Sequence, residues 1–556
     1  MAVDAQRPNA DSLLFLPLGG AGEIGMNLSL YGHAGKWLMV DLGISFGDET
    51  MPGIEVIMAD PAFIRERKRD LVGLVLTHAH EDHLGAVGYL WSELECPVYA
   101  VPFTAAVLRS KLHERGLVGR LKVQEVATGG RVQIGPFNVE MIGITHSIPE
   151  AHTLVIRTPA GSAVHTGDWK LDLEPQIGRL TDEAALARLA TEGIDALVGD
   201  STNALVPGYS GSEATVSAGL HDLFGRIGTR IAVTCFATNV ARLRSVALAA
   251  AAHDRRVALV GRSLWRIYEA ARGCGYLTDI PEFLTEHDAG YLPRDKVALV
   301  CTGSQGEPRS ALARIAAGDH PQILLEPGDV VVFSSREIPG NERAIATVQN
   351  RLLSQGIRLV TADNEPVHVS GHPARDELVQ MLQWVRPRAA VPVHGERRHQ
   401  EAHAEIARAC QVPETLICSN GTLVRLAPGP TEIIDHVPTG RLALDGKRLV
   451  ALNSGAMRSR HRVIWNGAVV ATLVLNQRGE IVTTPRLAIM GLVDEEHDRD
   501  LVVDLVESVR EAVAALPKSS RNDDETVIKT VRGAVRRCFH ASHGKKPQTE
   551  VHLIRV

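Results

Sequence analysis

Short apolar runs that end in polar, metal-ligand-type residues recur along the first half of the chain. The clearest run, residues 71–76, reads LVGLVL and leads into Thr77-His78-Ala79-His80-Glu81-Asp82-His83. A short apolar run with polar flanks predicts a buried β-strand. Because residues two apart on a strand share a face, His78 and His80 should project together from its carboxyl end. Asp82 and His83 follow where the pattern becomes helical, over residues 83–94.

The same pattern returns at four later runs. Residues 139–144 lead to His146, 162–164 to Asp168, 194–198 to Asp200, and 389–393 to His394. Any one of these residues could be a simple strand-end cap. In series, after the histidine-rich motif, they predict that ligand-type side chains converge at one edge of a sheet. Imidazole and carboxylate groups suit Zn²⁺ or Mn²⁺, and a bridged pair of such ions can activate water.

From Ser212 onwards, strand and helix patterns alternate. Residues 212–226 have a helical pattern with serine at the N-cap, and strands are expected at 230–235, 257–260, 297–301 and 329–333. Repeated alternation predicts a parallel sheet, whose ligands usually lie at the carboxyl ends of the strands. The loops at 303–306 and 334–341 follow two of these strands.

A histidine-containing segment, PVHVSG followed by His372 and Pro373, precedes a helical pattern over residues 374–385. Proline fits the first turn of a helix. The amides of residues 370–372 would then lie at a helix N-terminus, which is a ready anion site.

These patterns divide the chain into five parts. They are a first domain at 10–211 and an inserted domain at 212–364, then the remainder of the first domain at 365–434, a Gly/Pro-containing linker at 435–460 and a small α+β domain at 461–556.

Composition restricts the class of protein. The chain has 556 residues, 45% of them hydrophobic, and a net charge of −6, so a nucleic-acid partner would need a local positive surface. Residues 518–556 hold nine Lys/Arg against four Asp/Glu, which fits either an RNA-binding surface or a solvated face. Seven cysteines without CxxC spacing suggest reduced thiols in a cytoplasmic protein. No apolar run approaches the ~20 residues of a membrane span, and no signal peptide is evident, so no membrane partner is expected.

The HxHxDH motif, followed by His146 and Asp168, resembles the signature of the metallo-β-lactamase superfamily. The insertion between Asp200 and His368 resembles its β-CASP group. Within that group the chain is most similar to the ribonuclease J family, through the stretches LGGAGEIGMN, THSIPEA, TGDWK, GDSTNA, TGSQGEP, IPGNE, HVSGHP and VPVHGE. The resemblance implies an α/β fold: a metallo-β-lactamase αββα sandwich, an inserted β-CASP parallel α/β domain and a small α+β C-terminal domain.

The resemblance also implies roles for individual residues. One metal ion would be held by His78, His80 and His146, and the other by Asp82, His83 and His394, with Asp168 bridging. Asp82 would also orient the attacking water. His368 would act as general acid, supported by Asp200. The implied substrate-binding residues are Thr238, Asn239, His368, Val369, Ser370, Gly371 and His372, and Asp48 and Asp445 are candidates for a structural Ca²⁺.

The implied activity is hydrolysis of single-stranded RNA from the 5′ end, with endonuclease activity and a preference for 5′-monophosphate ends. It would serve rRNA maturation and mRNA decay, in a homodimer or homotetramer and within an RNA-degradation complex. The alternatives are a DNA-processing β-CASP nuclease, a non-catalytic RNA-binding scaffold and a small-molecule thioester hydrolase. The inserted domain argues against a thioester hydrolase, because a small substrate would not need a whole additional domain beside the metal centre.

Overall fold

The computed structural model describes residues 6–48, 50–338, 340–494 and 496–556, and the chain forms two compact units. The larger unit comprises Met1–Phe46 and Val56–Arg441, and the smaller comprises Gly47–Glu55 and Leu442–Val556.

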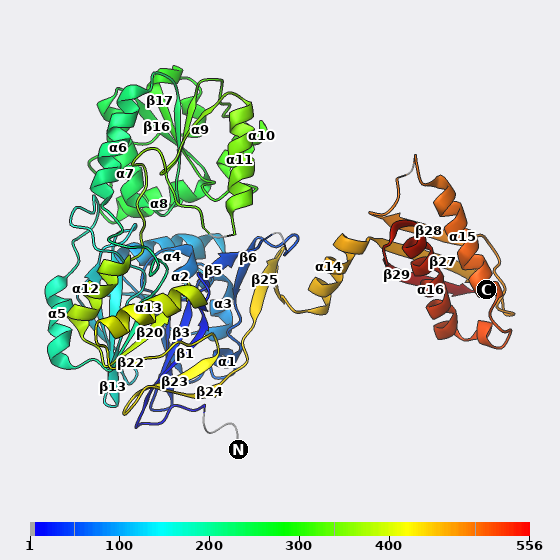
Figure 1. The fold of residues 1–556 in the computed structure, drawn as a ribbon, viewed down its shortest axis with the longest axis horizontal. Coiled ribbons are helices and arrows are strands. Elements are labelled where there is room, and N and C mark those ends of the chain that lie inside the picture. The colour runs from blue at the N-terminus through cyan, green and yellow to red at the C-terminus, as the bar shows by residue number, and fades with distance from the viewer. Residues whose placement is uncertain (1–5, 49, 339, 495) are drawn as a thin grey trace. The chain divides into compact units, whose positions relative to one another are not determined.

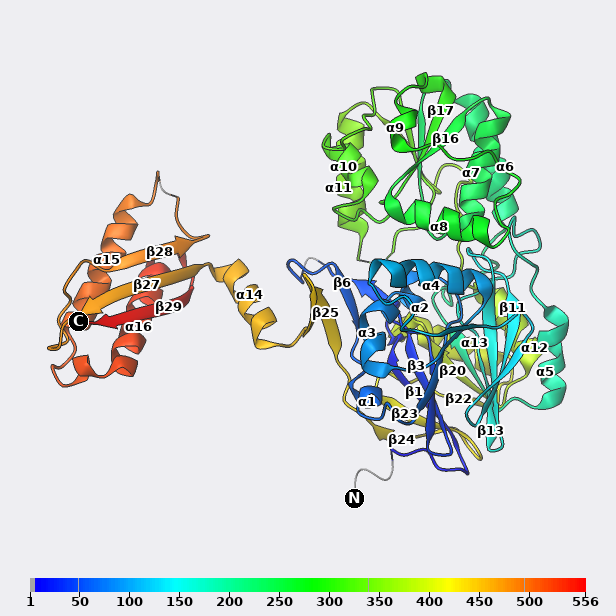
Figure 2. The same ribbon diagram turned by 180° about the vertical axis from the view of Figure 1, so that it is seen from behind.

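Two sheets face each other in the larger unit and form the predicted sandwich (Figures 1 and 2). The first contains, in spatial order, β24 (Glu432–His436), β23 (Thr422–Ala427), β1 (Leu13–Gly19), β3 (Leu28–His33), β4 (Lys36–Val40), β7 (Leu71–Val75), β8 (Val98–Ala100) and β9 (Val123–Glu125). The second contains β10 (Arg131–Ile134), β11 (Phe137–Ile144), β12 (Ala151–Thr158), β13 (Gly161–His165), β14 (Ala196–Asp200), β20 (Ala389–Val393) and β22 (Glu414–Thr415). Apolar residues of both sheets, such as Phe15 and Phe137, form one buried core between them.

Helices cover the outer faces of the sandwich. Residues of α5 (Glu183–Glu192), α12 (Arg375–Val385) and α13 (Arg397–Ala409) form a second core with the strands of the second sheet. The helices that follow strands of the first sheet are α1 (Ala62–Arg65), α2 (Glu81–Leu84), α3 (Val87–Leu94) and α4 (Pro102–Glu114). Two short strand pairs complete the sandwich: β2 (Ala21–Gly22) with β21 (Gly395–Glu396), and β5 (Ile44–Phe46) with β6 (Val56–Ala59).

The inserted domain contains the predicted parallel sheet. Its strands are β16 (Arg256–Val260), β17 (Val297–Cys301), β15 (Ile231–Thr234), β18 (Val330–Phe333) and β19 (Arg358–Val360), and every neighbouring pair is parallel. Its helices are α6 (Glu213–Arg226), α7 (Val240–Ala252), α8 (Arg262–Gly273), α9 (Glu286–Ala289), η1 (Arg294–Lys296), α10 (Ala311–Ala317) and α11 (Glu342–Ser354).

The smaller unit has a sheet covered by two long helices. Its elements are β25 (Arg441–Asp445), β26 (Arg448–Ala451), α14 (Gly455–Asn466), β27 (Ala468–Leu475), β28 (Arg486–Met490), α15 (Arg499–Ala514), η2 (Ser520–Asn522), α16 (Asp524–His543) and β29 (Gln548–Arg555). Leu505 and Phe539 from the two helices pack in one core with β27. Among the described residues, no helix is both long and apolar enough to cross a bilayer.

The stretch predicted as a linker, 435–460, is structured over much of its length. Strands β25 and β26 pair antiparallel, and Asp445 faces Arg448 at the turn. Gly446 has φ +63°, which allows the tight reversal between them. The dipeptide Asp445-Gly446 is a hairpin signal in this stretch. The stretch predicted as a linker thus contains regular structure, and its role as a linker stays a prediction.

Candidate metal centre

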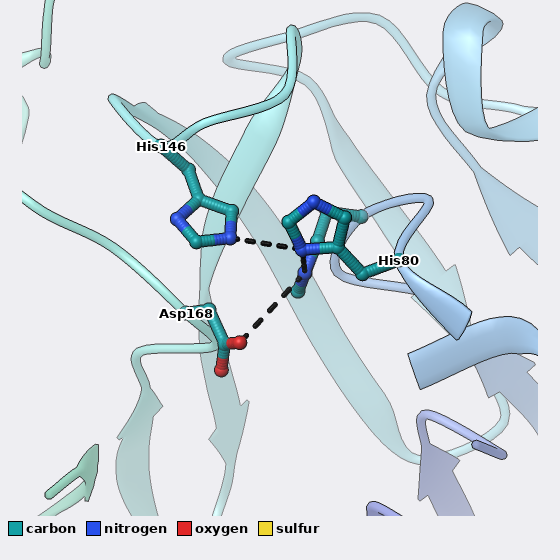
Figure 3. Close-up of side chains that lie close together, drawn as sticks. His80, His146 and Asp168 are labelled. Atoms are coloured by element: carbon teal, nitrogen blue, oxygen red, sulfur yellow. Dashed lines mark hydrogen bonds and ion pairs between the residues drawn. The ribbon is translucent and has the colours of Figure 1, made fainter. Parts of the chain in front are cut away.

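The predicted metal ligands meet where the strands of the sandwich end. His78 and His80 follow β7, His146 follows β11, Asp168 follows β13 and His394 follows β20. Figure 3 shows His80, His146 and Asp168 directed toward a common point. Two overlapping groups share Asp168: His78, His80 and His146 form one with it, and Asp82, His83 and His394 form the other. Within each group, one ligand atom per residue lies within 4.8 Å of all the others.

The spacing of these atoms leaves polar groups without ordinary partners. His80 Nδ1 lies 3.0 Å from His78 Nε2 and 3.0 Å from His146 Nε2. Asp168 Oδ1 and His394 Nε2 are buried and have no hydrogen-bond partner among the described residues. Buried polar atoms are normally satisfied. A divalent cation placed between them would satisfy several at once, so the residues present fit a metal site.

The protonation states of His78, His80, His146 and Asp168 also fit. Burial lowers the pKa of His78 and His146, chiefly by excluding water, and neighbouring histidines lower it further. Burial also lowers the pKa of His80, to about 4. Burial would raise the pKa of Asp168, but His394 and His83 lower it more, so it stays well below its usual value. Neutral imidazoles and ionised carboxylates are the forms that bind divalent metals. His83 differs: burial lowers its pKa, but Asp168, Asp82 and Asp41 raise it more, to well above the usual value, so a bound metal would have to displace its proton.

Asp41 orients one of these histidines, His83, through a hydrogen bond to its Nδ1. The Nδ1 of His83 donates to Asp41 Oδ2 at 2.7 Å, and the amide and hydroxyl of Thr77 both donate to the same carboxylate at 2.8 Å. This fixes the tautomer of His83 and leaves its Nε2 directed at the centre. Asp41 is itself fully buried. The structure makes it the partner of His83.

The other ligands are oriented in the same manner. His394 Nδ1 donates to Asn27 Oδ1 at 2.9 Å, and His146 Nδ1 donates to the carbonyl of Gly371 at 2.5 Å. Neither partner is a ligand type, and both are remote in sequence from the histidine they hold. Sequence reasoning therefore had no local signal for them.

The position of Asp200 corrects one prediction. The imidazole against its carboxylate belongs to His372, whose Nδ1 donates to Asp200 Oδ2 at 2.8 Å, and not to His368 as predicted. His372 also lies 3.7 Å from Asp168 Oδ2, and it groups with Asp168, Asp200 and His394 as a third cluster of ligand-type residues. The segment 368–372 approaches the carboxyl end of β14 through its last residue, so His372 is the histidine that reaches Asp200. Burial lowers the pKa of His372, but Asp200 and Asp168 raise it more, to about 9.

His368 lies instead among positively charged groups. Burial lowers its pKa to about 3, and the nearby Arg242, Lys170 and Arg336 act in the same direction. It is therefore neutral at pH 7. Val369 lies against Gly211, where an added Cβ would come within 2.9 Å of its side chain.

The predicted anion site, at the amides of residues 370–372, precedes the first turn of helix α12. The helix begins at Arg375 with Ala374 at its N-cap, so Pro373 precedes it. The carboxylate of Glu377 accepts the Ala374 amide at 2.7 Å, and the amide of His372 donates to Ser370 Oγ at 3.2 Å. The Ala374 amide is thus capped by an acidic side chain of the same helix, and anion binding by residues 370–372 stays a prediction.

Thr238 and Asn239 are the remaining predicted substrate-binding residues. Asn239 is the N-cap of α7 and accepts the amide of Arg242 at 2.9 Å, and Thr238 precedes it, half-buried. Their contact with substrate stays a prediction.

The Ca²⁺ candidates gain no support within the described residues. Asp48 accepts the Thr50 amide at 2.8 Å, while Asp445 lies 2.8 Å from Arg460. In the part of the chain that the structure describes, neither belongs to a group of at least three ligand-type side chains. Pro339, in the predicted 334–341 loop, lies outside the described residues.

Comparisons with known proteins agree with this architecture. Four family models match: "Metallo-beta-lactamase superfamily" at residues 22–208, "Ribonuclease J, beta-CASP domain" at 228–352, "Zn-dependent metallo-hydrolase RNA specificity domain" at 359–410 and "Ribonuclease J C-terminal domain" at 455–556.

Several curated relatives are similar over nearly their whole length, and each is named "Ribonuclease J". The protein of Sinorhizobium meliloti is 44% identical over 551 residues, 98% of each chain. That of Mycobacterium tuberculosis H37Rv is 36% identical over all of both chains, and that of Thermus thermophilus is 36% identical over 84% of this chain and 83% of its own. A solved structure from Enterococcus faecalis, of unknown function, has a TM-score of 0.52 at 14% identity, covers 74% of this chain and 100% of its own, and shows the fold alone.

Proposed function

The chain belongs to the ribonuclease J family, and from this premise we propose that it hydrolyses RNA phosphodiester bonds with two divalent metal ions, as a 5′→3′ exonuclease that also cleaves internally. The observation that carries this proposal is the pair of ligand groups sharing Asp168. The match of residues 359–410 to an RNA specificity domain supports RNA over DNA as the substrate.

The residues of the centre have different proposed roles in binding the metal ions and the attacking water. His78, His80 and His146 would hold one ion, and Asp82, His83 and His394 the other, with Asp168 between them. When bound, Zn²⁺ or Mn²⁺ ions supply Lewis-acid activation of the phosphate and of the attacking water. Asp82 keeps 30% of its side chain exposed, whereas the other three members of its ligand group are buried, so within that group it is the ligand best placed to orient that water.

His372 is the proposed proton donor to the leaving oxygen. It lies 3.7 Å from the carboxylate that both ligand groups share, and Asp200 holds its Nδ1 at 2.8 Å. Its Nε2 is thereby available toward the substrate. A group placed in this way can protonate the leaving oxygen as the bond breaks. His368, neutral and surrounded by cations, is assigned to substrate positioning instead.

Three further properties complete the proposal. The enzyme prefers single-stranded RNA with a 5′-monophosphate. It acts in rRNA maturation and mRNA decay. It works in the cytoplasm as a homodimer or homotetramer, with an RNA-degradation complex as its wider partner. The family membership supports each of these.

The test is an assay of 5′-end-labelled, 5′-monophosphorylated RNA with metal-stripped enzyme and graded Mn²⁺, Zn²⁺ or Mg²⁺. We expect no cleavage without metal, and release of labelled mononucleotide when the correct ion is restored. His80→Ala should abolish most of this activity while the fold is kept, because the ligand lies at a rigid strand end. His113→Ala, an exposed histidine on α4, is the matched control.

The same assay separates the rivals. Faster cleavage of DNA of the same sequence would favour a DNA-processing enzyme. RNA binding without cleavage under every metal would favour a scaffold. Full activity of His80→Ala would refute the metal centre.

A further inference from the structure

Three cations lie around His368: Arg242, Lys170 and Arg336. Arg242 is fully buried, and its guanidinium lies 3.1 Å from the buried carboxylate of Glu213. That charge is neutralised within the protein, so it offers nothing to a ligand.

Lys170 is also fully buried, with Nζ 3.0 Å from Asp172. Arg336 differs from both. It is exposed, and the described residues place no carboxylate within ion-pair distance of its guanidinium. Within the described residues, its guanidinium donates from Nη1 to the neutral amide oxygen of Asn203, at 2.8 Å. Arg336 is therefore the cation of this cluster whose charge is not compensated.

Asn203 connects this guanidinium to the proposed proton donor. Its Nδ2 donates to Ser370 Oγ at 2.7 Å and to the carbonyl of His372 at 3.1 Å. Arg336 thus lies two hydrogen bonds from His372. An uncompensated cation held beside the proposed proton donor is suited to bind an anionic backbone.

The loop that carries Arg336 is held in place. Gln305 is 5% exposed, and its Nε2 donates to the Arg336 carbonyl at 2.8 Å. The Oε1 of Gln305 accepts from the Ile338 amide at 2.9 Å and from Asn341 Nδ2 at 3.2 Å. The inserted domain therefore presents this arginine from a fixed backbone, as a pre-organised binding group requires.

We propose that Arg336 binds the RNA phosphate adjacent to the one that is hydrolysed. A guanidinium has five N–H donors in a planar fork that matches phosphate oxygens, and one of them is already used to aim the group. In removal of the first nucleotide, the adjacent phosphate on the upstream side is the 5′-terminal phosphate. In internal cleavage it is a backbone phosphodiester. This inference deepens the proposed ribonuclease function and rests on it.

The test compares Arg336→Gln and Arg336→Lys with Arg351→Gln, a control that removes another exposed arginine of the same domain, on helix α11. Each metal-loaded enzyme is assayed on one RNA sequence carrying either a 5′-monophosphate or a 5′-hydroxyl. A lost charge-assisted contact should raise KM by about 10- to 100-fold in Arg336→Gln, with kcat changed less than about 3-fold. Arg336→Lys should lose less, because it keeps the charge but not the fork. The control should behave as wild type.

Salt dependence gives a second measure. Losing one phosphate contact should reduce the slope of log affinity against log salt by about 0.7 for single-stranded RNA. Loss confined to the 5′-monophosphate RNA would identify the terminal phosphate as the ligand, and equal loss on both RNAs would identify an internal one.

Two results would overturn the inference. One is an unchanged KM on both RNAs in a folded Arg336→Gln enzyme. The other is a fall in kcat with KM and the salt slope unchanged, which would mean that Arg336 only positions the His372 loop through Asn203. Wild-type enzyme that fails to cleave RNA would instead defeat the proposed function itself.

Discussion

Asp41→Asn should weaken metal binding while leaving the fold intact. Asp41 is fully buried behind the ligand His83, and its backbone has φ +61°. Asparagine tolerates this left-handed conformation and has nearly the same shape as aspartate. The substitution therefore removes the charge and one acceptor oxygen without forcing the backbone to move.

The magnitude follows from the hydrogen bonds. The carboxylate of Asp41 accepts His83 Nδ1 at 2.7 Å and two donors of Thr77 at 2.8 Å. An amide has a single oxygen for these three donors, so at least one loses its partner. If His83 loses it, the ring can turn to the tautomer that is protonated on Nε2, which does not bind metal. Loss of such an outer partner typically costs about 10- to 100-fold in metal affinity, or about 1.4–2.7 kcal/mol.

The assay is calorimetric titration of Zn²⁺ or Mn²⁺ into metal-stripped protein, together with thermal melting with and without metal. Metal should raise the Tm of Asp41→Asn less than that of wild type, because stabilisation follows affinity. Asp254→Asn is the matched control: it also has a positive φ, +53°, but it pairs with Lys296 at 2.6 Å, away from the centre. Wild-type affinity at every site of a folded Asp41→Asn protein would refute the reasoning.

Two further predictions concern proton transfer and pH. His372→Asn should lower kcat by about 100-fold or more with a smaller change in KM, whereas His368→Asn should chiefly raise KM; steady-state kinetics on 5′-monophosphate RNA would contradict this if the two variants behaved alike. Burial would raise the pKa of Glu140, but Arg157 and Arg131 lower it more, so its folded pKa lies below its unfolded value of about 4.3. Its stabilising contribution is therefore present above that unfolded value and is lost as pH falls through the folded one. Glu140→Gln should reduce the free energy of unfolding by about 1–3 kcal/mol at pH 7, and the deficit should shrink below pH 4 in urea titrations. A deficit in the free energy of unfolding that does not vary with pH would contradict the stabilising role of the ionised Glu140 carboxylate.

The ligand positions could be predicted because their signals are local. Each follows an apolar run that must be a strand, and the period of two puts His78 and His80 on one face. Parallel neighbours such as β13, β14 and β20 bring their carboxyl ends to the same edge, which gathers Asp168, Asp200 and His394. The alternation of strands and helices fixed the inserted domain in the same way.

The partners of those ligands could not be predicted from pattern. Asn27 lies 367 residues from the histidine it holds, and nothing in its neighbourhood marks it as more than a strand-flanking residue. The choice between His368 and His372 was missed for a related reason. Both lie in an irregular segment, where no period says which side chain turns toward Asp200.

The irregular segment 367–372 is hydrogen-bonded both to the inserted domain and to residues near the metal centre. Val367 accepts a hydrogen bond from Arg242 of the inserted domain at 3.0 Å, Ser370 contacts Asn203, and the Gly371 carbonyl holds the ligand His146. Gly371 allows this close approach, because a Cβ there would come within 2.7 Å of the His146 ring. The six residues 367–372 therefore contact the inserted domain and a predicted metal ligand, and they include His372, the proposed proton donor. The side chain of Arg242, in the inserted domain, and the ligand His146 are thus both hydrogen-bonded to one short segment of backbone.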